Sequence, residues 1–178
     1  MISTEKGINI IQNIRLITKK HVFLSKICSC QKKAVILRGK KLLMMKRKAH
    51  IIQLPKITDP RGNLSVIEEN NHIPFKIKRT YWIYDVPGGE TRGGHAYRTN
   101  EEVIVALSGS FDVLIDEGKG EKQQFSLNRS YYGLFVPKGT WRELTNFSTN
   151  SLALILSSTE YSAEDYIRDY EQFRKGGK

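Results

Sequence analysis

Four residues of the 178-residue chain combine side-chain types and spacing that could perform acid–base chemistry on a bound ligand. His95 and Tyr97 are separated by one residue, Glu102 follows after four more, and Arg142 lies much further along the chain. Residues two apart in a strand share one face of the sheet, so His95 and Tyr97 can point to the same place. An imidazole can take up and return a proton near neutral pH, a phenol donates a hydrogen bond, and a guanidinium binds anions. The combination predicts a pocket for an anionic or polar organic ligand.

Short segments rich in β-branched and aromatic residues surround these positions and predict the strands that hold them. Apolar and polar residues alternate in the stretches EEVIVALSG and SFDVLID, as expected for strands with one buried face. Gly, Asn and Pro separate such segments, for example in DPRGN and PGGETRGG. Strands at this spacing are typical of an all-β sandwich or barrel. We therefore expect residues 50–160 to form one antiparallel barrel.

Only the C-terminal end of the chain predicts a helix. Ser162 is a candidate N-cap, and Asp165 follows three residues later. Three aromatic residues then fall on one helical face, namely Tyr166, Tyr170 and Phe173. This pattern, with Gly176 as the stop signal, predicts a short helix.

The first 50 residues differ from the rest in charge. They contain 13 Lys and Arg against one acid, Glu5, whereas residues 51–178 contain 16 basic and 17 acidic residues. The net charge of +11 therefore belongs to the N-terminal segment. It gives no reason to expect nucleic acid or a membrane surface as the partner of the remaining chain.

The same segment lacks the features of a metal site or a membrane anchor. Cys28 and Cys30 have no second cysteine pair to complete a zinc site. No apolar run approaches the roughly 20 residues of a membrane span, and no signal peptide is evident. We predict a cytoplasmic protein with a basic extension at residues 1–49 and one domain at residues 50–178. Residues 1–43 are expected to be disordered or not native, with a functional basic arm as the alternative.

Two groups of residues have the spacing of the two motifs of cupin barrels, and the chain resembles that fold. The first group is Gly89, His95, Tyr97, Glu102 and Gly109, and the second is Pro137, Gly139, Arg142 and Asn146. A metal-binding cupin uses positions 95, 97, 102 and 142 as ligands, and histidine is usual at 97 and 142. Here only His95 and Glu102 could bind a metal, and the permanent charge of Arg142 would repel it. The residues therefore predict a site without metal.

A more specific resemblance covers about residues 50–175. The chain is similar to the nucleotide-sugar 3,4-ketoisomerases, metal-free cupins related to the C-terminal domain of WxcM-like proteins. The matches that carry this resemblance are Arg92-Gly93-x-His95, the YYGL strand, Trp141 and the terminal DYIRDY. It implies an RmlC-like jelly-roll cupin barrel that works as a homodimer without a cofactor. It also implies isomerisation of a dTDP-4-keto-6-deoxyhexose to the 3-keto sugar, on the way to 3-amino-3,6-dideoxy sugars of surface glycans.

The reaction that the resemblance implies assigns roles to several residues. His95 fits the base that removes the C3 proton and returns one at C4. Tyr97, where similar proteins usually have a second histidine, could donate a hydrogen bond to the enolate oxygen. Glu102 could orient His95 or hold Arg142.

Further residues are candidates for binding the nucleotide sugar. Guanidinium groups suit a diphosphate or a sugar oxygen, and the arginines considered are Arg61, Arg92, Arg98 and Arg142. Aromatic rings could stack on thymine or line the pocket, and the candidates are Trp82, Tyr84 and Trp141. The C4 configuration of the product is left open.

Two other functions stay open. A catalytically silent cupin that only binds a nucleotide sugar is favoured by the loss of one histidine. A nucleotide-sugar 3,5-epimerase shares the barrel and the substrate, but it needs a His–Asp dyad, and we cannot place one in the sequence.

Overall fold

The structure, a computed structural model, describes residues 48–118 and 121–176, and most of its regular elements are strands. The strands are β1 (His50–Gln53), β2 (Lys56–Asp59), β3 (Gly62–Ser65), β4 (Arg79–Ile83), β5 (Arg92–Tyr97), β6 (Glu102–Ser108), β7 (Phe111–Asp116), β8 (Gln123–Leu127), β9 (Tyr132–Val136), β10 (Trp141–Thr145), β11 (Leu152–Ser157) and β12 (Tyr166–Ile167). A 3-10 turn, η1 (Ala163–Asp165), and one helix, α2 (Tyr170–Arg174), complete the set. The predicted disorder of residues 1–43 falls outside the described residues.

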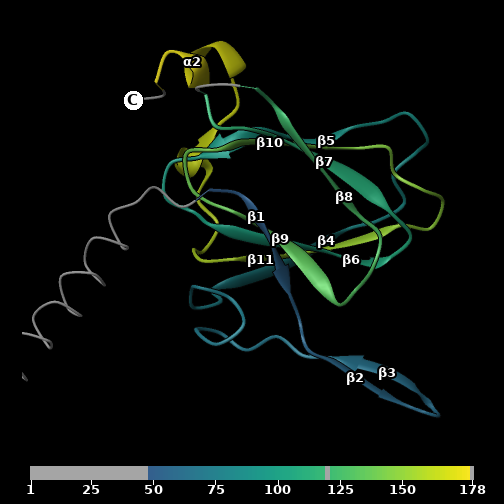
Figure 1. Cartoon of the computed structure of the whole chain (residues 1–178). Helices are drawn as coiled ribbons and strands as arrows, with labels where there is room; N and C mark the ends of the chain where they lie inside the picture. Colours follow the sequence, from purple (N-terminus) through teal and green to yellow (C-terminus); the bar gives the residue numbers. More distant parts are fainter. Residues whose placement is uncertain (1–47, 119–120, 177–178) are drawn as a thin grey trace, which may run out of the picture. The chain divides into compact units, whose positions relative to one another are not determined.

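Two five-stranded sheets form the body of the fold (Figure 1). One sheet has the order β1-β9-β6-β11-β4 and the other has the order β12-β5-β10-β7-β8. All strand pairs within the two sheets are antiparallel. The expected all-β architecture is therefore confirmed.

The main core lies between the two sheets and follows from alternation along the strands. In β7, Phe111, Val113 and Ile115 are all buried, and they belong to a cluster that also contains Ile104 of β6 and Ile155 of β11. Residues two apart in a strand share a face, so each sheet presents an apolar side to the other.

Strand β6 is buried on both faces, which explains why its sequence is a nearly continuous apolar run. Ile104 packs into the main core, whereas Val103 and Val105 belong to a second cluster. Ile73 and Phe75, in the segment between β3 and β4, pack in that second cluster and are buried with it. The central strand is therefore held rigidly, and Glu102 at its first position is held with it.

The C-terminal segment differs from the predicted helix. Tyr166 lies in β12, which pairs with β5, and Ser162 makes no side-chain capping bond. The helix begins only at Tyr170, and its N-cap Asp169 accepts a hydrogen bond from the backbone N–H of Gln172. The prediction of a helix from residue 162 is wrong because pairing with the edge of β5 satisfies the backbone of residues 166–167 instead.

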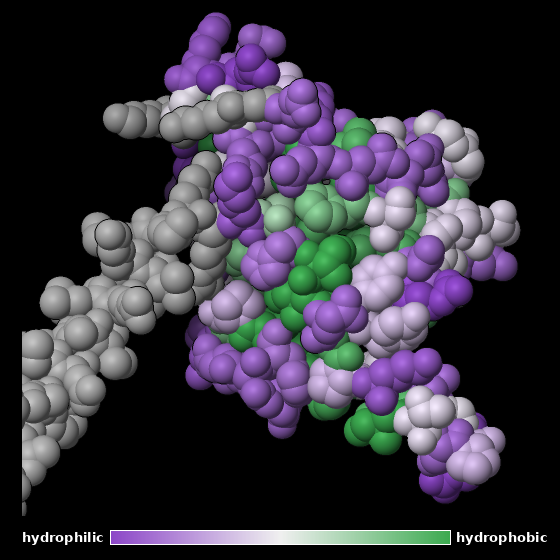
Figure 2. Space-filling view, in the orientation of Figure 1, coloured by the Kyte–Doolittle hydropathy of each residue, from purple (hydrophilic) through white to green (hydrophobic). Residues whose placement is uncertain are grey.

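A hairpin formed by β2 and β3 extends from the barrel (Figure 1), and all eight of its strand residues are exposed. Ile57 and Leu64 are each 57% exposed. Figure 2 shows hydrophobic side chains gathered in the middle of one face of the barrel, with polar side chains around them. No helix in the described part of the chain has the length and apolar character needed to cross a membrane.

Candidate active site

His95 and Tyr97 lie near the end of β5 and point into the space between the sheets. His95 is 7% exposed and Tyr97 is 4% exposed. Ala96 between them faces the other way and packs with Trp141 and Ile167 in a separate cluster. The predicted sharing of one face by His95 and Tyr97 is therefore what the structure shows.

Glu102 and Arg142 lie beside His95 and Tyr97 and come from opposite sheets, Glu102 from β6 and Arg142 from β10. Arg142 Nε of β10 donates to Glu102 Oε2 of β6 at 2.8 Å. The Tyr81 hydroxyl donates to Glu102 Oε1 at 2.7 Å and accepts a hydrogen bond from Arg142 Nη2 at 3.1 Å. Ser157 and Asn100 donate to the same Oε1 atom at 3.2 and 3.3 Å. The carboxylate is thus fully engaged in a buried network.

Both members of this buried ion pair keep their charge. Burial alone raises the pKa of Glu102, but the charge of Arg142 and the hydrogen bonds from Arg142 and Tyr81 outweigh it and lower the pKa overall. Burial lowers the pKa of Arg142, but the charge of Glu102 outweighs it and raises the pKa overall. Glu102 is therefore a structural counter-ion and not a proton acceptor.

The protonation state of His95 follows from its surroundings. Its Nδ1 atom lies 2.9 Å from the carbonyl oxygen of Gly93. A carbonyl can only accept a hydrogen bond, so Nδ1 carries the proton and Nε2 carries the free lone pair. Burial first, and then the charge of Arg142, lower the pKa of His95 to about 4. The ring is therefore neutral at pH 7, and its Nε2 atom is buried without a hydrogen-bond partner.

Tyr97 contributes a neutral hydroxyl next to this imidazole. The rings of His95 and Tyr97 are 4.8 Å apart and nearly perpendicular, and Tyr166 packs against both at 4.7 and 4.6 Å. Burial and the charge of Glu102 raise the pKa of Tyr97 above its usual value, so the hydroxyl stays protonated. The Tyr97 hydroxyl and Arg142 Nη1 are also buried without partners. One hydrogen-bond acceptor, His95 Nε2, and two donors, the Tyr97 hydroxyl and Arg142 Nη1, are therefore available to a ligand.

Gly93 makes this arrangement possible. Its φ of +91° is in a region that favours glycine, and its own carbonyl holds the His95 ring. A Cβ atom at this position would lie 2.8 Å from Arg142 Nη1 and 3.0 Å from the Arg142 carbonyl oxygen. A larger residue would displace Arg142 from the site.

The structure places three of the predicted arginines away from this cluster. Arg61 lies in the turn of the β2–β3 hairpin and pairs with Asp59 at 2.8 Å. Arg92 is exposed at the first residue of β5, at the other end of the strand from Tyr97. Arg98 is exposed and donates to the carbonyl oxygen of Glu164 at 3.3 Å.

The predicted aromatic residues also lie outside the lumen. Trp82 and Tyr84 are 59% and 60% exposed, because they alternate with Tyr81 and Ile83 along β4. Trp141 packs with Phe173 and donates to Glu143 at 2.8 Å, in the cluster beneath α2. In a single chain these rings do not contact His95.

Two tyrosines of the site were not predicted. Tyr81 could have been recognised from the alternation along β4, which places it on the same face as Ile83. Tyr166 could not, because it was assigned to a helix. Among the described residues there is no group of three or more ligating side chains that could hold a metal ion.

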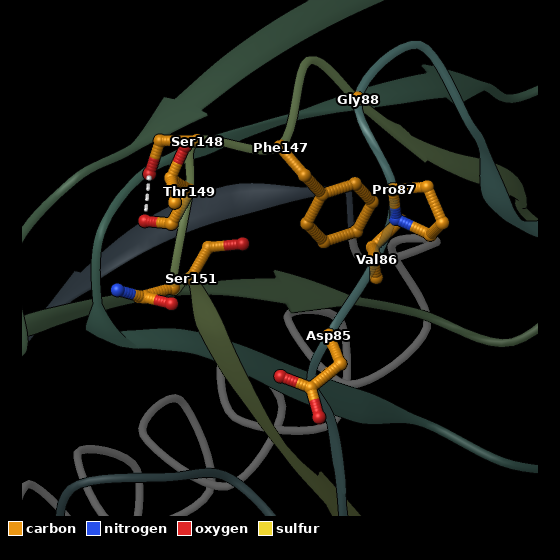
Figure 3. Close-up of a pocket in the computed structure, with 9 residues that line it drawn as sticks. Asp85, Val86, Pro87, Gly88, Phe147, Ser148, Thr149 and Ser151 are labelled. Carbon is orange, nitrogen blue, oxygen red and sulfur yellow. Dashed lines mark hydrogen bonds between the residues drawn. The ribbon is translucent and has the colours of Figure 1, made fainter.

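A cavity of about 330 Å³ lies at the opposite end of the barrel (Figure 3). Residues 85–88, which follow β4, and residues 147–151, which join β10 to β11, line it. His95, Glu102 and Arg142 instead lie near the start of β10 and the end of β11. The cavity is therefore distinct from the buried cluster.

Comparison with known proteins shows the family to which the chain belongs. A family model described as FdtA, WxcM-like, C-terminal, matches residues 47–178. A TDP-4-oxo-6-deoxy-alpha-D-glucose-3,4-oxoisomerase from Aneurinibacillus thermoaerophilus is 43% identical over 125 residues, which cover 70% of this chain and 89% of that protein.

Two solved structures are similar over most of their length. The WlaRB TDP-quinovose 3,4-ketoisomerase from Campylobacter jejuni is 39% identical with a TM-score of 0.69, and the match covers 73% of this chain and 99% of that one. A mutant of the 3,4-ketoisomerase QdtA from Thermoanaerobacterium thermosaccharolyticum, in complex with TDP-4-keto-6-deoxyglucose, is 32% identical with a TM-score of 0.70. That match covers 74% of this chain and 94% of the other.

The two facing sheets and the enclosed cluster of His95, Tyr97, Glu102 and Arg142 define a jelly-roll cupin of the kind found in sugar isomerases. The chain belongs to the WxcM-like C-terminal family.

Proposed function

We propose that this protein is an isomerase that moves the keto group of a dTDP-4-keto-6-deoxyhexose from C4 to C3. The relatives named above support the substrate class and the reaction. The observation within this chain that carries the proposal is the neutral His95 ring, whose unpartnered Nε2 faces a site with two unpaired hydrogen-bond donors.

The reaction consists of proton transfers alone. His95 Nε2 takes the proton from C3, the C3–H electrons form the C3–C4 double bond, and the carbonyl electrons move to O4. In the resulting enediolate the proton of the C3 hydroxyl passes to the neighbouring O4, the electrons on O3 form the C3 carbonyl, and the electrons of the C3–C4 double bond take the proton of the imidazolium at C4. A base that is neutral at pH 7 can perform both carbon-proton steps.

Tyr97 and Arg142 stabilise the oxygens during this sequence. The Tyr97 hydroxyl donates to the enolate oxygen, and Arg142 Nη1 donates to a neighbouring sugar oxygen. Arg142 Nε donates a hydrogen bond to Glu102, and this bond fixes the position of the guanidinium before substrate binds. Donors that are already in place stabilise developing charge without reorganisation.

We further propose that the protein forms homodimers. The hairpin carries Ile57 and Leu64 on its surface, Val66 is exposed directly after it, and Trp82 and Leu107 are exposed on the barrel. Apolar side chains gathered on a surface favour contact with a partner. Replacing Ile57 and Leu64 with lysine should convert a dimer to a monomer in sedimentation at micromolar concentration, and a monomeric native protein would contradict the proposal.

Proton NMR with dTDP-4-keto-6-deoxyglucose in deuterated water tests the activity. We expect the signals of a 3-keto sugar to appear with deuterium at C3 of the substrate or C4 of the product. Binding without exchange or product would support the silent cupin instead. Deuterium at C5 would support a 3,5-epimerase, although the Nδ1 atom of His95 is held by a carbonyl and not by an aspartate.

A further inference from the structure

Asn100 lies in the short connection between β5 and β6, and only 1% of its surface is exposed. Its Oδ1 atom accepts hydrogen bonds from the backbone N–H groups of Ser158 and Thr159, at 3.1 and 3.2 Å, and from the Ser158 hydroxyl at 3.2 Å. A backbone N–H group can only donate, so the oxygen of the amide faces these residues. The amide nitrogen therefore faces the other way.

The amide nitrogen faces the buried carboxylate of Glu102. Nδ2 donates to Glu102 Oε1 at 3.3 Å and to the Ser157 hydroxyl at 3.4 Å, and that hydroxyl donates to the same Oε1 atom at 3.2 Å. Glu102 in turn accepts from Arg142 Nε at 2.8 Å. Asn100 is thus joined to Arg142 through a single residue.

The backbone beside Asn100 is also held in place, by Asp165 of η1. The carboxylate of Asp165 accepts hydrogen bonds from the backbone N–H groups of Thr99 and Asn100, at 2.7 and 3.1 Å, and from the Thr99 hydroxyl at 2.8 Å. The amide of Asn100 is therefore fixed through both its backbone and its side chain before any ligand binds. A group fixed in this way can support a charged residue of the site without reorganisation.

Charged groups contact Asn100 from two elements. Glu102 of β6 accepts from its side chain, and Asp165 of η1 accepts from its backbone N–H. Arg142 and the Tyr81 hydroxyl contact the same Glu102 carboxylate. A neutral amide at position 100 adds a hydrogen bond to Glu102 and leaves the charge of the pair unchanged, whereas a carboxylate there would place a second negative charge against it.

We infer that Asn100 is a positioning residue for the isomerisation, which holds Glu102 so that Arg142 Nη1 stays directed at the sugar. The inference rests on the proposed function, since it needs a sugar oxygen that Arg142 binds. Nη1 is buried without a partner, and its direction depends on the bond between Arg142 Nε and Glu102. Loosening of Glu102 should therefore affect turnover more than binding of the nucleotide.

Asn100→Asp tests this role because it exchanges a donor for an acceptor with almost no change in shape. A carboxyl oxygen would face Glu102 Oε1 in place of the amide nitrogen. Two carboxyl groups at hydrogen-bond distance share one proton, because their mutual repulsion raises the pKa at which that proton is lost. While the proton is held, a hydrogen bond to Glu102 remains, and after its loss the two carboxylates repel each other. The variant should therefore become less active as the pH rises.

The decisive quantity is kcat of the variant relative to native kcat, measured with dTDP-4-keto-6-deoxyglucose between about pH 5.5 and about pH 8.5. We expect a value within about threefold of native at the lower pH and a loss of about tenfold at the higher pH, the effect of one hydrogen bond to a charged group. Calorimetric affinity for dTDP should stay nearly native at both. Asn146→Asp is the matched control, because Asn146 Nδ2 donates to Asp112 Oδ2 at 2.7 Å but at an exposed position. Its relative kcat should not depend on pH.

A second measurement does not depend on turnover. The Nε–H group of Arg142 gives a signal in proton–nitrogen correlation NMR spectra, identified by its absence in Arg142→Met. This signal should be displaced or lost at the higher pH in Asn100→Asp and unchanged in the native protein. Such a displacement, together with a native protein that isomerises no sugar, would show that Asn100 positions Arg142 and would contradict the proposed function alone.

Two results with Asn100→Asp would overturn the inference. One is native kcat at both pH values, and the other is a loss of equal size at both, because altered packing alone does not follow a titration. Asn100→Ala, which introduces no charge, decides the question if the aspartate variant unfolds at the higher pH. Its kcat should fall about tenfold with dTDP affinity nearly native, and native kcat with an unmoved Arg142 signal would overturn the positioning role.

Discussion

The two ends of the barrel differ in whether buried polar atoms lack hydrogen-bond partners. At the end with His95, the buried atoms without a hydrogen-bond partner include His95 Nε2, the Tyr97 hydroxyl and Arg142 Nη1. At the other end, a cavity of about 330 Å³ is lined by residues 85–88 and 147–151. None of the described buried polar atoms without a partner belongs to that lining. The cavity lining therefore has no described buried polar atom that needs a ligand to complete its hydrogen bonds.

This difference shows which feature identifies the site. An unpaired buried polar atom costs about 1–3 kcal/mol, so several together are retained where a ligand completes their bonds. A surface hollow carries no such cost. The cluster around His95 is thus a better candidate for the active site than the cavity at the other end, which Figure 3 shows.

The largest effect on turnover is expected for His95→Asn, which tests whether the end of the barrel with His95 is the active site. Asparagine keeps a hydrogen-bonding side chain but removes the base, so turnover should fall by about 10²- to 10⁴-fold while dTDP binding remains. Steady-state kinetics and calorimetry measure the two quantities. His50→Asn, in an exposed position on β1, is the control and should have native turnover. Full turnover in the His95 variant would show that the base lies elsewhere.

The second prediction concerns stability. Glu102→Ala leaves the buried charge of Arg142 without its counter-ion, so the free energy of unfolding should fall by about 3–5 kcal/mol. Urea denaturation followed by circular dichroism measures it. Glu102→Gln keeps an oxygen that can accept from Tyr81 and should lose less, and Glu121→Ala, at an exposed position, should lose almost nothing. Equal midpoints for the alanine variant and the native protein would mean that the pair does not hold the site together.

Much of this site could be predicted from the sequence, and the limits have a physical cause. Local alternation places His95 and Tyr97 on one face, and the resemblance to the two cupin motifs implies that Glu102 and Arg142 lie in the same lumen. Tyr166 fits a helical pattern with Tyr170 and Phe173, and only its pairing with β5, a contact distant in sequence, makes it a strand residue.

The positions of two arginines, Arg61 and Arg79, could not be predicted from the local sequence either. Arg61 was predicted to bind the substrate because a guanidinium suits a diphosphate or a sugar oxygen. The direction in which the β2–β3 hairpin extends is not encoded by its own residues, and in one chain the hairpin carries Arg61 away. Arg79 lacked any motif, so its place beside Ser157 and Glu102 became evident only from strand register.

The third prediction separates the two unpaired groups on β5. Tyr97→Phe removes one hydrogen bond to the enolate oxygen, and turnover should fall by about tenfold, less than for His95→Asn. Tyr97→His restores the residue that is usual in similar ketoisomerases, and we expect activity at or above the native value. Tyr131→Phe, in the turn at the other end of β9, is the control and should have native turnover. Native turnover in the Tyr97→Phe variant would exclude the hydroxyl from the reaction.

The fourth prediction concerns pH. The base is active when neutral, and burial together with Arg142 lowers the pKa of His95 to about 4. Lowering the pH from 8 to 6 should therefore leave kcat/KM nearly unchanged, and the loss should begin only as the pH approaches 4. An unshifted histidine with a pKa of about 6.5 would instead lose about fourfold over the same interval. That fourfold loss, measured on a protein shown to remain folded, would contradict the neutral buried ring.

The smallest effect is expected at the cavity of the opposite end. Thr149 is exposed on its rim, between β10 and β11. Thr149→Phe should partly fill the hollow, yet a surface substitution of this kind changes stability by no more than about 0.5 kcal/mol. Since the site lies at the other end of the strands, kcat/KM and dTDP affinity should stay within about twofold of the native values, as they should for the matched variant Thr149→Ala. A large loss in the phenylalanine variant alone would mean that ligand occupies this cavity, and the distinction between the two ends would no longer hold.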